Sequence, residues 1–292
     1  MTNRRTFLTQ AGLVSAGMLI KPNFLSAAIN SKQIGLQLYT LRNELPKDVK
    51  GVIAKVAKAG YKEVETFGFD QKTGYWGLSS KEFSALLQSH GLTTPSGHYG
   101  LNQFFGDGKT DDLKAYIDVA HITGQSYIVV PSLTEQFIKT ADDFKSIAGK
   151  MNKAAELCKA EGLKLGYHNH NFEWKPVEGT TFYDTILKYT DPALVHMEMD
   201  LFWVVRAGQD PVEILGKHAG RFFAVHVKDR DKTNTNLNTE IGKGSIDFKG
   251  ILPKARAAGV KHFIMEQENF INIDPYTSIA ESCNYMKNSL SV

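Results

Sequence analysis

The sequence has little cysteine and no run of hydrophobic residues long enough for a membrane helix. Cys158 and Cys283 are too few for a disulfide scaffold, and their spacing is not that of a metal motif. The apolar stretch from Ala11 to Ile20 has about half the length that a membrane-spanning helix needs. With 42% hydrophobic and 22% charged residues, 25 Gly and 9 Pro, the composition excludes collagen-like, low-complexity and largely disordered chains.

The formal charge of +3 belongs to the first 28 residues. They hold Arg4, Arg5 and Lys21 and no acid, so without them 31 of the 34 basic residues remain against 31 acidic ones. A neutral chain has no general attraction for nucleic acid or for anionic membranes. We therefore expect neither nucleic acid nor a membrane as a partner.

The N-terminus predicts an export signal over residues 1–28. Arg4-Arg5 precedes the apolar stretch, and the small residues Ser26-Ala27-Ala28 follow it. The paired arginines resemble the twin-arginine signal, which exports folded proteins, so a periplasmic location is expected. A short buried helix or a membrane anchor is the alternative interpretation of this stretch.

From residue 29 to 292 the chain predicts a single domain of eight strand–helix units, which is the pattern of an α/β (β/α)₈ TIM barrel. Glycine follows several predicted helices, as in a left-handed C-cap. A doubly wound sheet is the rival, but no Gly-rich phosphate loop follows the first strand. The expected strands are 34–39, 63–67, 93–98, 127–131, 163–168, 195–200, 222–227 and 263–266, and the clearest helices are 47–59, 80–90, 111–123, 141–160 and 182–189. The polar stretch 229–239 is expected to be a loop.

Ionisable residues gather where these strands end, which in a TIM barrel is where active sites lie. Residues two apart on a strand face the same side, so strand-end residues that are separated by one position, such as Glu198 and Asp200, point in the same direction. If these charges faced the outer helices unpaired, each would cost several kcal/mol, so we place them at the barrel mouth. The strand-end residues are Glu65, His98, His168, His170, Glu198, Asp200, His226, Lys228, Glu266 and Glu268. Imidazole and carboxylate from four strands form a mixed nitrogen and oxygen site suited to Mn²⁺, Co²⁺, Mg²⁺ or Zn²⁺.

These residues resemble the xylose isomerase-like TIM-barrel superfamily, which includes tagatose-type 3-epimerases and inosose dehydratases. The resemblance covers about residues 33–290 and rests on Met199-Asp200 with Trp203 and Ala207-Gly208, on Val225-His226-Val227-Lys228-Asp229, and on Ile264-Met265-Glu266. It implies one divalent metal held by His168, Asp200, His226 and Glu266, with His170 as the rival of His168.

The fifth strand departs from the epimerases, because His168 stands where they carry a glutamate. The resemblance gives Glu266 the role of proton-transferring base, assisted by His170 and Lys228. One base and one acid also allow elimination or hydration. His98, Glu65, Trp203, Glu240 and Glu268 are the candidate substrate-binding residues.

The sequence thus predicts a metal-dependent isomerase or epimerase that acts on a neutral keto-sugar by removing a proton next to its carbonyl. A lyase or hydratase acting on an oxidised, 3-keto sugar or glycoside is the alternative within the same site. A non-catalytic carbohydrate-binding barrel would not need Glu266, Asp200 and both histidines. A nucleic-acid enzyme resembling endonuclease IV conflicts with the neutral charge and the export signal.

Overall fold

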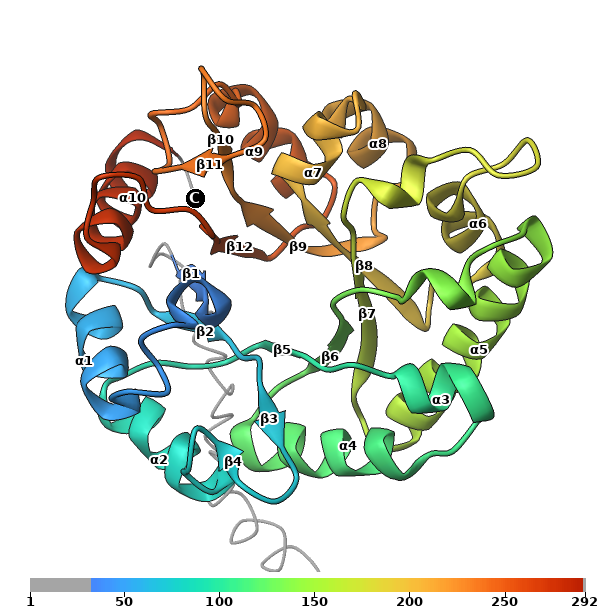
Figure 1. Cartoon of the computed structure of the whole chain (residues 1–292), viewed down its shortest axis with the longest axis horizontal. Coiled ribbons are helices and arrows are strands. Elements are labelled where there is room, and N and C mark those ends of the chain that lie inside the picture. Colours follow the sequence, from blue (N-terminus) through green and yellow to red (C-terminus); the bar gives the residue numbers. More distant parts are fainter. Residues whose placement is uncertain (1–32, 291–292) are drawn as a thin grey trace, which may run out of the picture. The chain divides into compact units, whose positions relative to one another are not determined.

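The computed structural model describes residues 33–290, and the expected export signal at 1–28 lies outside them. Eight parallel strands stand at the centre and helices surround them (Figure 1). The strands are β1 (Ile34–Gln37), β2 (Glu63–Glu65), β5 (Ser96–His98), β6 (Tyr127–Val130), β7 (Lys164–His168), β8 (Val195–Asp200), β9 (Phe222–Val227) and β12 (His262–Met265).

The sheet closes on itself between β2 and β5. The Val64 amide donates to the Thr93 carbonyl over 2.9 Å, and the His98 amide donates to the Thr66 carbonyl over 2.7 Å. All other neighbouring strands pair in parallel, in the order β2-β1-β12-β9-β8-β7-β6-β5. Closure confirms the predicted TIM barrel and rules out the open doubly wound sheet.

The outer layer consists of helices, and capping residues in the sequence mark where these helices begin and end. Thr140 and Asp143 form a capping box at the start of one helix, and Gly124 ends another in a left-handed conformation at φ 78°. The helices are α1 (Val49–Ala59), α2 (Ser80–Ser89), α3 (Asn102–Asp107), α4 (Asp111–Thr123), α5 (Ala141–Ala160), α6 (Phe182–Tyr189), α7 (Leu201–Arg206), α8 (Pro211–Lys217), α9 (Phe248–Ala257) and α10 (Pro275–Ser289). Three short 3₁₀ turns lie at Leu38–Leu41, Glu135–Phe137 and Phe172–Trp174. None of the helices within residues 33–290 combines the length and the apolarity needed to cross a bilayer.

Apart from the main apolar core of the domain, a smaller apolar cluster packs among the strands. The Tyr127 ring stacks on the Phe223 ring with centroids 3.9 Å apart, and Val129, Ala224 and Ile264 complete the cluster. Gly166 makes room for it, because a Cβ there would lie only 3.0 Å from Phe223 Cε1. The strands thus have a packed interior, and the ionic groups described below lie further along them toward their carboxyl ends.

Several predictions of local structure were wrong. The strands expected at 63–67 and 93–98 are shorter, because β2 ends at Glu65 and β5 begins at Ser96. Strand β1 ends at Gln37 rather than Tyr39, because the Gln37 side chain accepts from the Tyr39 amide and begins the first 3₁₀ turn. The predicted loop 229–239 contains the hairpin β10 (Asp229–Arg230) and β11 (Asn238–Thr239). A similar hairpin, β3 (Phe69–Asp70) and β4 (Gly74–Tyr75), follows β2.

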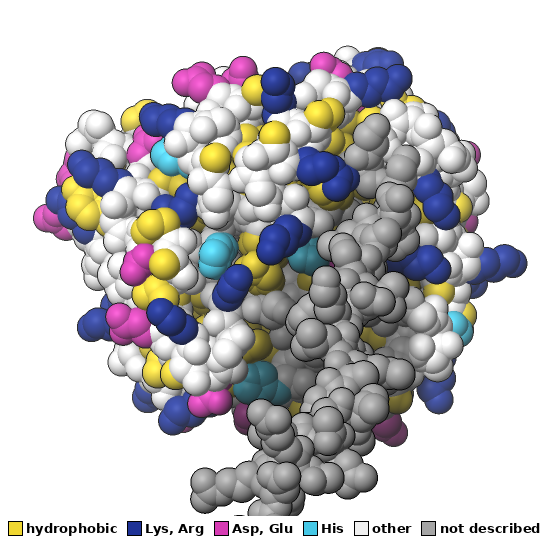
Figure 2. All heavy atoms as spheres, turned by 180° about the vertical axis from the view of Figure 1, so that it is seen from behind, with side chains coloured by type: hydrophobic (Ala, Val, Ile, Leu, Met, Phe, Trp, Pro, Cys, Tyr) yellow, Lys and Arg dark blue, Asp and Glu magenta, His cyan; other side chains and the backbone are white. Residues whose placement is uncertain are grey.

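The side opposite to the view of Figure 1 carries mixed charges. Where its atoms are not grey, Figure 2 shows Lys and Arg side chains scattered among acidic, polar and hydrophobic ones. The functional site is expected at the carboxyl ends of the strands, where the active sites of TIM barrels lie.

Candidate metal centre and pocket

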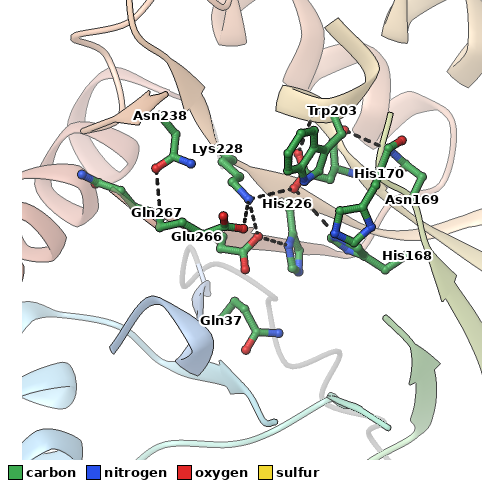
Figure 3. Close-up of polar contacts among 12 residues, drawn as sticks. Gln37, His168, Asn169, His170, Trp203, His226, Lys228, Asn238, Glu266 and Gln267 are labelled. Carbon is green, nitrogen blue, oxygen red and sulfur yellow. Dashed lines mark hydrogen bonds and ion pairs between the residues drawn. The ribbon is translucent and has the colours of Figure 1, made fainter. Parts of the chain in front are cut away.

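Four side chains meet at the carboxyl ends of four neighbouring strands. His168 ends β7, Asp200 ends β8, His226 is the penultimate residue of β9, and Glu266 directly follows β12. One potential ligand atom from each lies within 4.8 Å of the others. Figure 3 shows His168, His226 and Glu266 directed toward a common space. The structure therefore brings together the four residues that the sequence analysis assigned to a metal.

Asp200 uses its two carboxylate oxygens differently. Oδ1 accepts from the Trp203 amide over 3.1 Å and caps helix α7. Among residues 33–290, Oδ2 finds no hydrogen-bond partner although it is buried. The Asn169 side chain accepts from the Asp200 amide over 3.1 Å and so ties the end of β7 to the end of β8. A buried carboxylate oxygen held in this way fits a cation.

Lys228 places a buried ammonium group beside the same carboxylates. Its Nζ lies 3.2 Å from Glu266 Oε2, 3.6 Å from Asp200 Oδ2 and 2.6 Å from Glu268 Oε1. Three carboxylates around one ammonium leave two negative charges, which suits a divalent ion. Nitrogen and oxygen donors together fit Mn²⁺, Co²⁺ or Zn²⁺ better than they fit Ca²⁺.

The cations also set the protonation of the two carboxyl groups. Burial raises the pKa of Glu266, but the charges of Lys228 and His226 outweigh it and lower the pKa below its ordinary value. Burial raises the pKa of Asp200 to about 6, although the Lys228 ammonium opposes that shift. Both carboxyl groups are therefore mainly ionised at neutral pH, which a ligand or a base requires.

A deeper layer of carboxylates and histidines lies below these four residues. Glu198 Oε2 lies 2.8 Å from His98 Nε2, and Glu65 Oε2 lies 2.7 Å from His226 Nε2. Burial lowers the pKa of His98, but Glu65 and Glu198 raise it, to about 10. Burial and the nearby Glu65 charge raise the pKa of Glu198 to about 7. This layer holds charges of both signs in a dry environment.

A pocket of about 400 Å³ opens beside the four residues, and His168 and Glu266 are the two of them that line it. Trp203 and His170 form one wall, with ring centroids 5.3 Å apart, and burial and the Lys228 charge lower the pKa of His170 to about 4. No lysine or arginine is among the described residues that line it, which are Tyr39, Phe67, Gly68, His98, Pro131, Ser132, His168, His170, Trp203, Glu266 and Glu268.

The predicted substrate-binding residues are not all at this pocket. His98, Trp203 and Glu268 line it. Glu65 is fully buried in the deeper layer, where its carboxylate accepts from Gln37 and Ser96. Glu240 lies away from the pocket lining, and its carboxylate accepts from the Ser278 hydroxyl over 3.2 Å.

Sequence reasoning did not assign a role to Glu198 or Glu173. Glu198 precedes Asp200 by two residues and therefore lies on the same face of β8. This spacing is the sequence signal that could have assigned Glu198 to the site. Glu173 lies in a 3₁₀ turn and is fully buried, where it accepts from the His170 amide at 2.9 Å and the Tyr167 hydroxyl at 2.8 Å. No strand pattern marks it, because it belongs to a loop.

Known proteins share this arrangement of elements. Residues 53–289 match the xylose isomerase-like TIM barrel family. A sugar phosphate isomerase/epimerase from Parabacteroides distasonis is 31% identical over 90% of this chain and 96% of its own, with a TM-score of 0.80. The IolI protein, solved with a zinc atom, is 14% identical with a TM-score of 0.70, which shows the fold alone.

Curated relatives match a shorter stretch. An inosose dehydratase from Clostridium tetani is 31% identical over 44% of this chain and 47% of its own length, and one from Geobacillus kaustophilus is 32% identical over 39% and 42%. The chain thus spans about half the length of the curated relatives it matches. The prediction of an enzyme is confirmed by these dehydratase, isomerase and epimerase relatives, and the chain belongs to the xylose isomerase-like TIM-barrel superfamily.

Proposed function

We propose that this protein is a divalent-metal-dependent enzyme that acts on a neutral keto-sugar by transferring a proton at the carbon next to its carbonyl. The observation that carries the proposal is the convergence of His168, Asp200, His226 and Glu266 beside an open pocket. A bound divalent metal would polarise the sugar's carbonyl and hydroxyl oxygens and so make the neighbouring C–H more acidic.

The chain's own residues supply the proton transfer. Glu266 lines the pocket and is ionised, so its carboxylate can accept the proton of the substrate carbon. His170 also lines the pocket, and its Nδ1 is buried with no partner among the described residues. It is the candidate for exchanging a proton on the opposite side of the sugar. Lys228 holds the Glu266 carboxylate in place, with its Nζ 3.2 Å from Glu266 Oε2.

The pocket favours an uncharged sugar. The described residues that line it include Glu266 and Glu268 but no lysine or arginine that could hold a phosphate. The Trp203 ring offers an apolar face of the kind that packs against a sugar ring. An unphosphorylated substrate also agrees with the proposed export signal at residues 1–28 and a periplasmic location.

Elimination or hydration on an oxidised, 3-keto sugar or glycoside is the second candidate. His168, rather than a glutamate, ends β7, so Glu266 is the single carboxylate of the four that lines the pocket. Epimerisation through two opposed metal-site carboxylates would need a second one among these four, and Glu268, the other carboxylate at the pocket, is paired with Lys228. The inosose dehydratases among the relatives support the same alternative.

Glu266→Gln tests the proposed base. It keeps an oxygen toward the metal and loses the basic carboxylate, so kcat should fall by about 10²–10⁴-fold. We would incubate the manganese-loaded protein with ketoses and 3-keto glycosides in D₂O, following deuterium incorporation, epimer formation and dehydrated product separately.

The matched control is Glu63→Gln. Glu63 is also a buried glutamate paired with a histidine, His262, but it begins β2 at the other end of the strand. It should retain wild-type exchange. Exchange at the wild-type rate in metal-loaded Glu266→Gln would show that the base lies elsewhere, with His170 as the next residue to test.

A further inference from the structure

Beneath the proposed metal centre, one carboxylate oxygen lies close to a ring nitrogen from each of three histidines. Glu198 Oε2 lies 2.8 Å from His98 Nε2, 3.0 Å from His168 Nδ1 and 3.2 Å from His226 Nε2. Glu198 has no exposed surface, and it lies two residues before Asp200 on β8. A strand alternates its sides, so Glu198 points the same way as Asp200, one step deeper.

Glu65, at the end of β2, is a second carboxylate that contacts two of these histidines. Its Oε2 lies 2.7 Å from His226 Nε2 and 3.1 Å from His98 Nε2. The carboxylate is itself held, because Gln37 Nε2 donates to Oε2 and Ser96 Oγ donates to Oε1, each over 2.6 Å. Glu65 is therefore fixed in one orientation toward His226.

The two ring nitrogens of each shared histidine face opposite ways. His168 turns Nδ1 to Glu198, while its Nε2 lies 3.9 Å from Asp200 Oδ2. His226 turns Nε2 to Glu65, while its Nδ1 lies 3.1 Å from Glu266 Oε2. An imidazole that binds a metal through one nitrogen keeps its N–H on the other, and a carboxylate accepts only that N–H. A metal at His226 Nδ1 would therefore take the place of the proton that Nδ1 shares with Glu266 Oε2.

We propose that Glu198 and Glu65 are positioning residues for the metal centre. They accept the N–H groups of His168 and His226 from below and thereby present His168 Nε2 and His226 Nδ1, as lone pairs, to the metal. This inference rests on the proposed function, since it assumes that the four residues above hold a metal. It assigns which nitrogen of each histidine is the ligand, which the identity of the four residues alone does not determine.

The short separations distinguish this role from a second cation site. His98, His168, Glu198 and His226 also lie close enough together for a metal. However, His98 Nε2 and His168 Nδ1 stand 2.8 and 3.0 Å from one Glu198 oxygen, and His226 Nε2 stands 2.7 Å from Glu65, which are the separations of direct N–H···O hydrogen bonds. A second ion would also require both nitrogens of His168 and His226 to be ligands at once. One metal per chain is therefore expected.

The test measures metal affinity rather than activity. Wild type, Glu198→Gln and Glu63→Gln would be titrated with Zn²⁺ and Mn²⁺ against a chelator of known affinity, with metal content counted per chain. Loss of such a carboxylate partner weakens metal binding by about 10–100-fold. We expect that loss for Glu198→Gln and an unchanged Kd for Glu63→Gln, whose carboxylate accepts from His262 Nδ1 over 2.9 Å outside the site.

A second measurement needs no variant that must fold. Nitrogen-15 NMR of the zinc-loaded wild type should show His168 protonated at Nδ1 and His226 protonated at Nε2, each with zinc on the other nitrogen. The reverse pattern, two zinc ions per chain, or an unchanged Kd in Glu198→Gln would overturn the inference alone. A wild type that binds no divalent metal would instead overturn the proposed function, and the inference with it.

Discussion

One Asp200 oxygen caps helix α7 and the other faces the proposed metal, so substitutions can separate the two contributions. Asp200→Asn keeps an oxygen that can cap α7 through the Trp203 amide but replaces the oxygen that faces the proposed metal. Asp200→Ala removes both. We expect both variants to lose the metal and the activity while largely keeping the fold, and only the alanine variant to lose the helix cap as well.

The expected magnitudes follow from these contacts. Loss of an aspartate cap costs about 1 kcal/mol, so in EDTA the alanine variant should be less stable than the asparagine variant by that amount. In a domain of this size this lowers Tm by about 2–4 °C. Metal at 100 times the wild-type Kd should stabilise wild type by about 2.7 kcal/mol and both variants by much less.

The assay is urea unfolding in EDTA and in Mn²⁺, with metal content measured by mass spectrometry. Asp210→Ala is the matched control, because Asp210 caps α8 by accepting from the Val212 amide over 2.8 Å and is exposed outside the site. It should lose about 1 kcal/mol and keep the full metal stabilisation. Full metal occupancy in Asp200→Ala would refute the assignment of Asp200 as a ligand.

Three further predictions concern the buried charges and the N-terminus. Burial raises the pKa of Glu173 from 4.5 to about 7, so wild-type stability should fall relative to Glu173→Gln by about 3 kcal/mol as the pH rises from 4.5 to 7. Urea unfolding at pH 4.5 and 7.5 measures this, and parallel pH profiles would contradict it. Lys228→Met leaves Asp200 and Glu266 without their ammonium partner, so unfolding in EDTA should show a loss of about 3–5 kcal/mol that saturating Mn²⁺ partly restores; an equal loss with and without metal would argue against a cation site there. The native protein, sequenced from its N-terminus, should begin near Ile29, and a cytoplasmic form beginning at Met1 would exclude export.

Local sequence signals predicted those elements whose ends are fixed by nearby residues. Helices 111–123, 141–160 and 182–189 match α4, α5 and α6 residue for residue. Strands 195–200 and 222–227 match β8 and β9 in the same way. At β1 the prediction overran, because a side-chain bond from the Tyr39 amide to Gln37 ends the strand although the residues stay apolar. The hairpins have strands of two residues, too short for an alternating pattern to show.

For the site as well, features that depend on neighbouring residues could be predicted from the sequence, and contacts between distant residues could not. Strand ends and the two-residue alternation predicted that ionisable residues gather at the barrel mouth, and the resemblance to the superfamily selected His168, Asp200, His226 and Glu266 among them. Alternation could not reveal which charges face one another across the barrel. His98 and Glu198 are 100 residues apart, and their contact depends on the closure of the sheet between β2 and β5.

The same alternation explains why the site has two levels. Along β8, Glu198 precedes Asp200 by two residues, and along β9, His226 precedes Lys228 by two. On β8, Glu198 thus lies in the deeper layer and Asp200 at the mouth, whereas on β9 His226 contacts both layers, with Nε2 toward Glu65 and Nδ1 toward Glu266. A carboxylate at the mouth can serve substrate or metal only if the groups beneath it do not move. The buried contacts of Glu65 and Glu198 give the mouth that rigid support. Leaving any of these charges unpaired away from water would cost several kcal/mol.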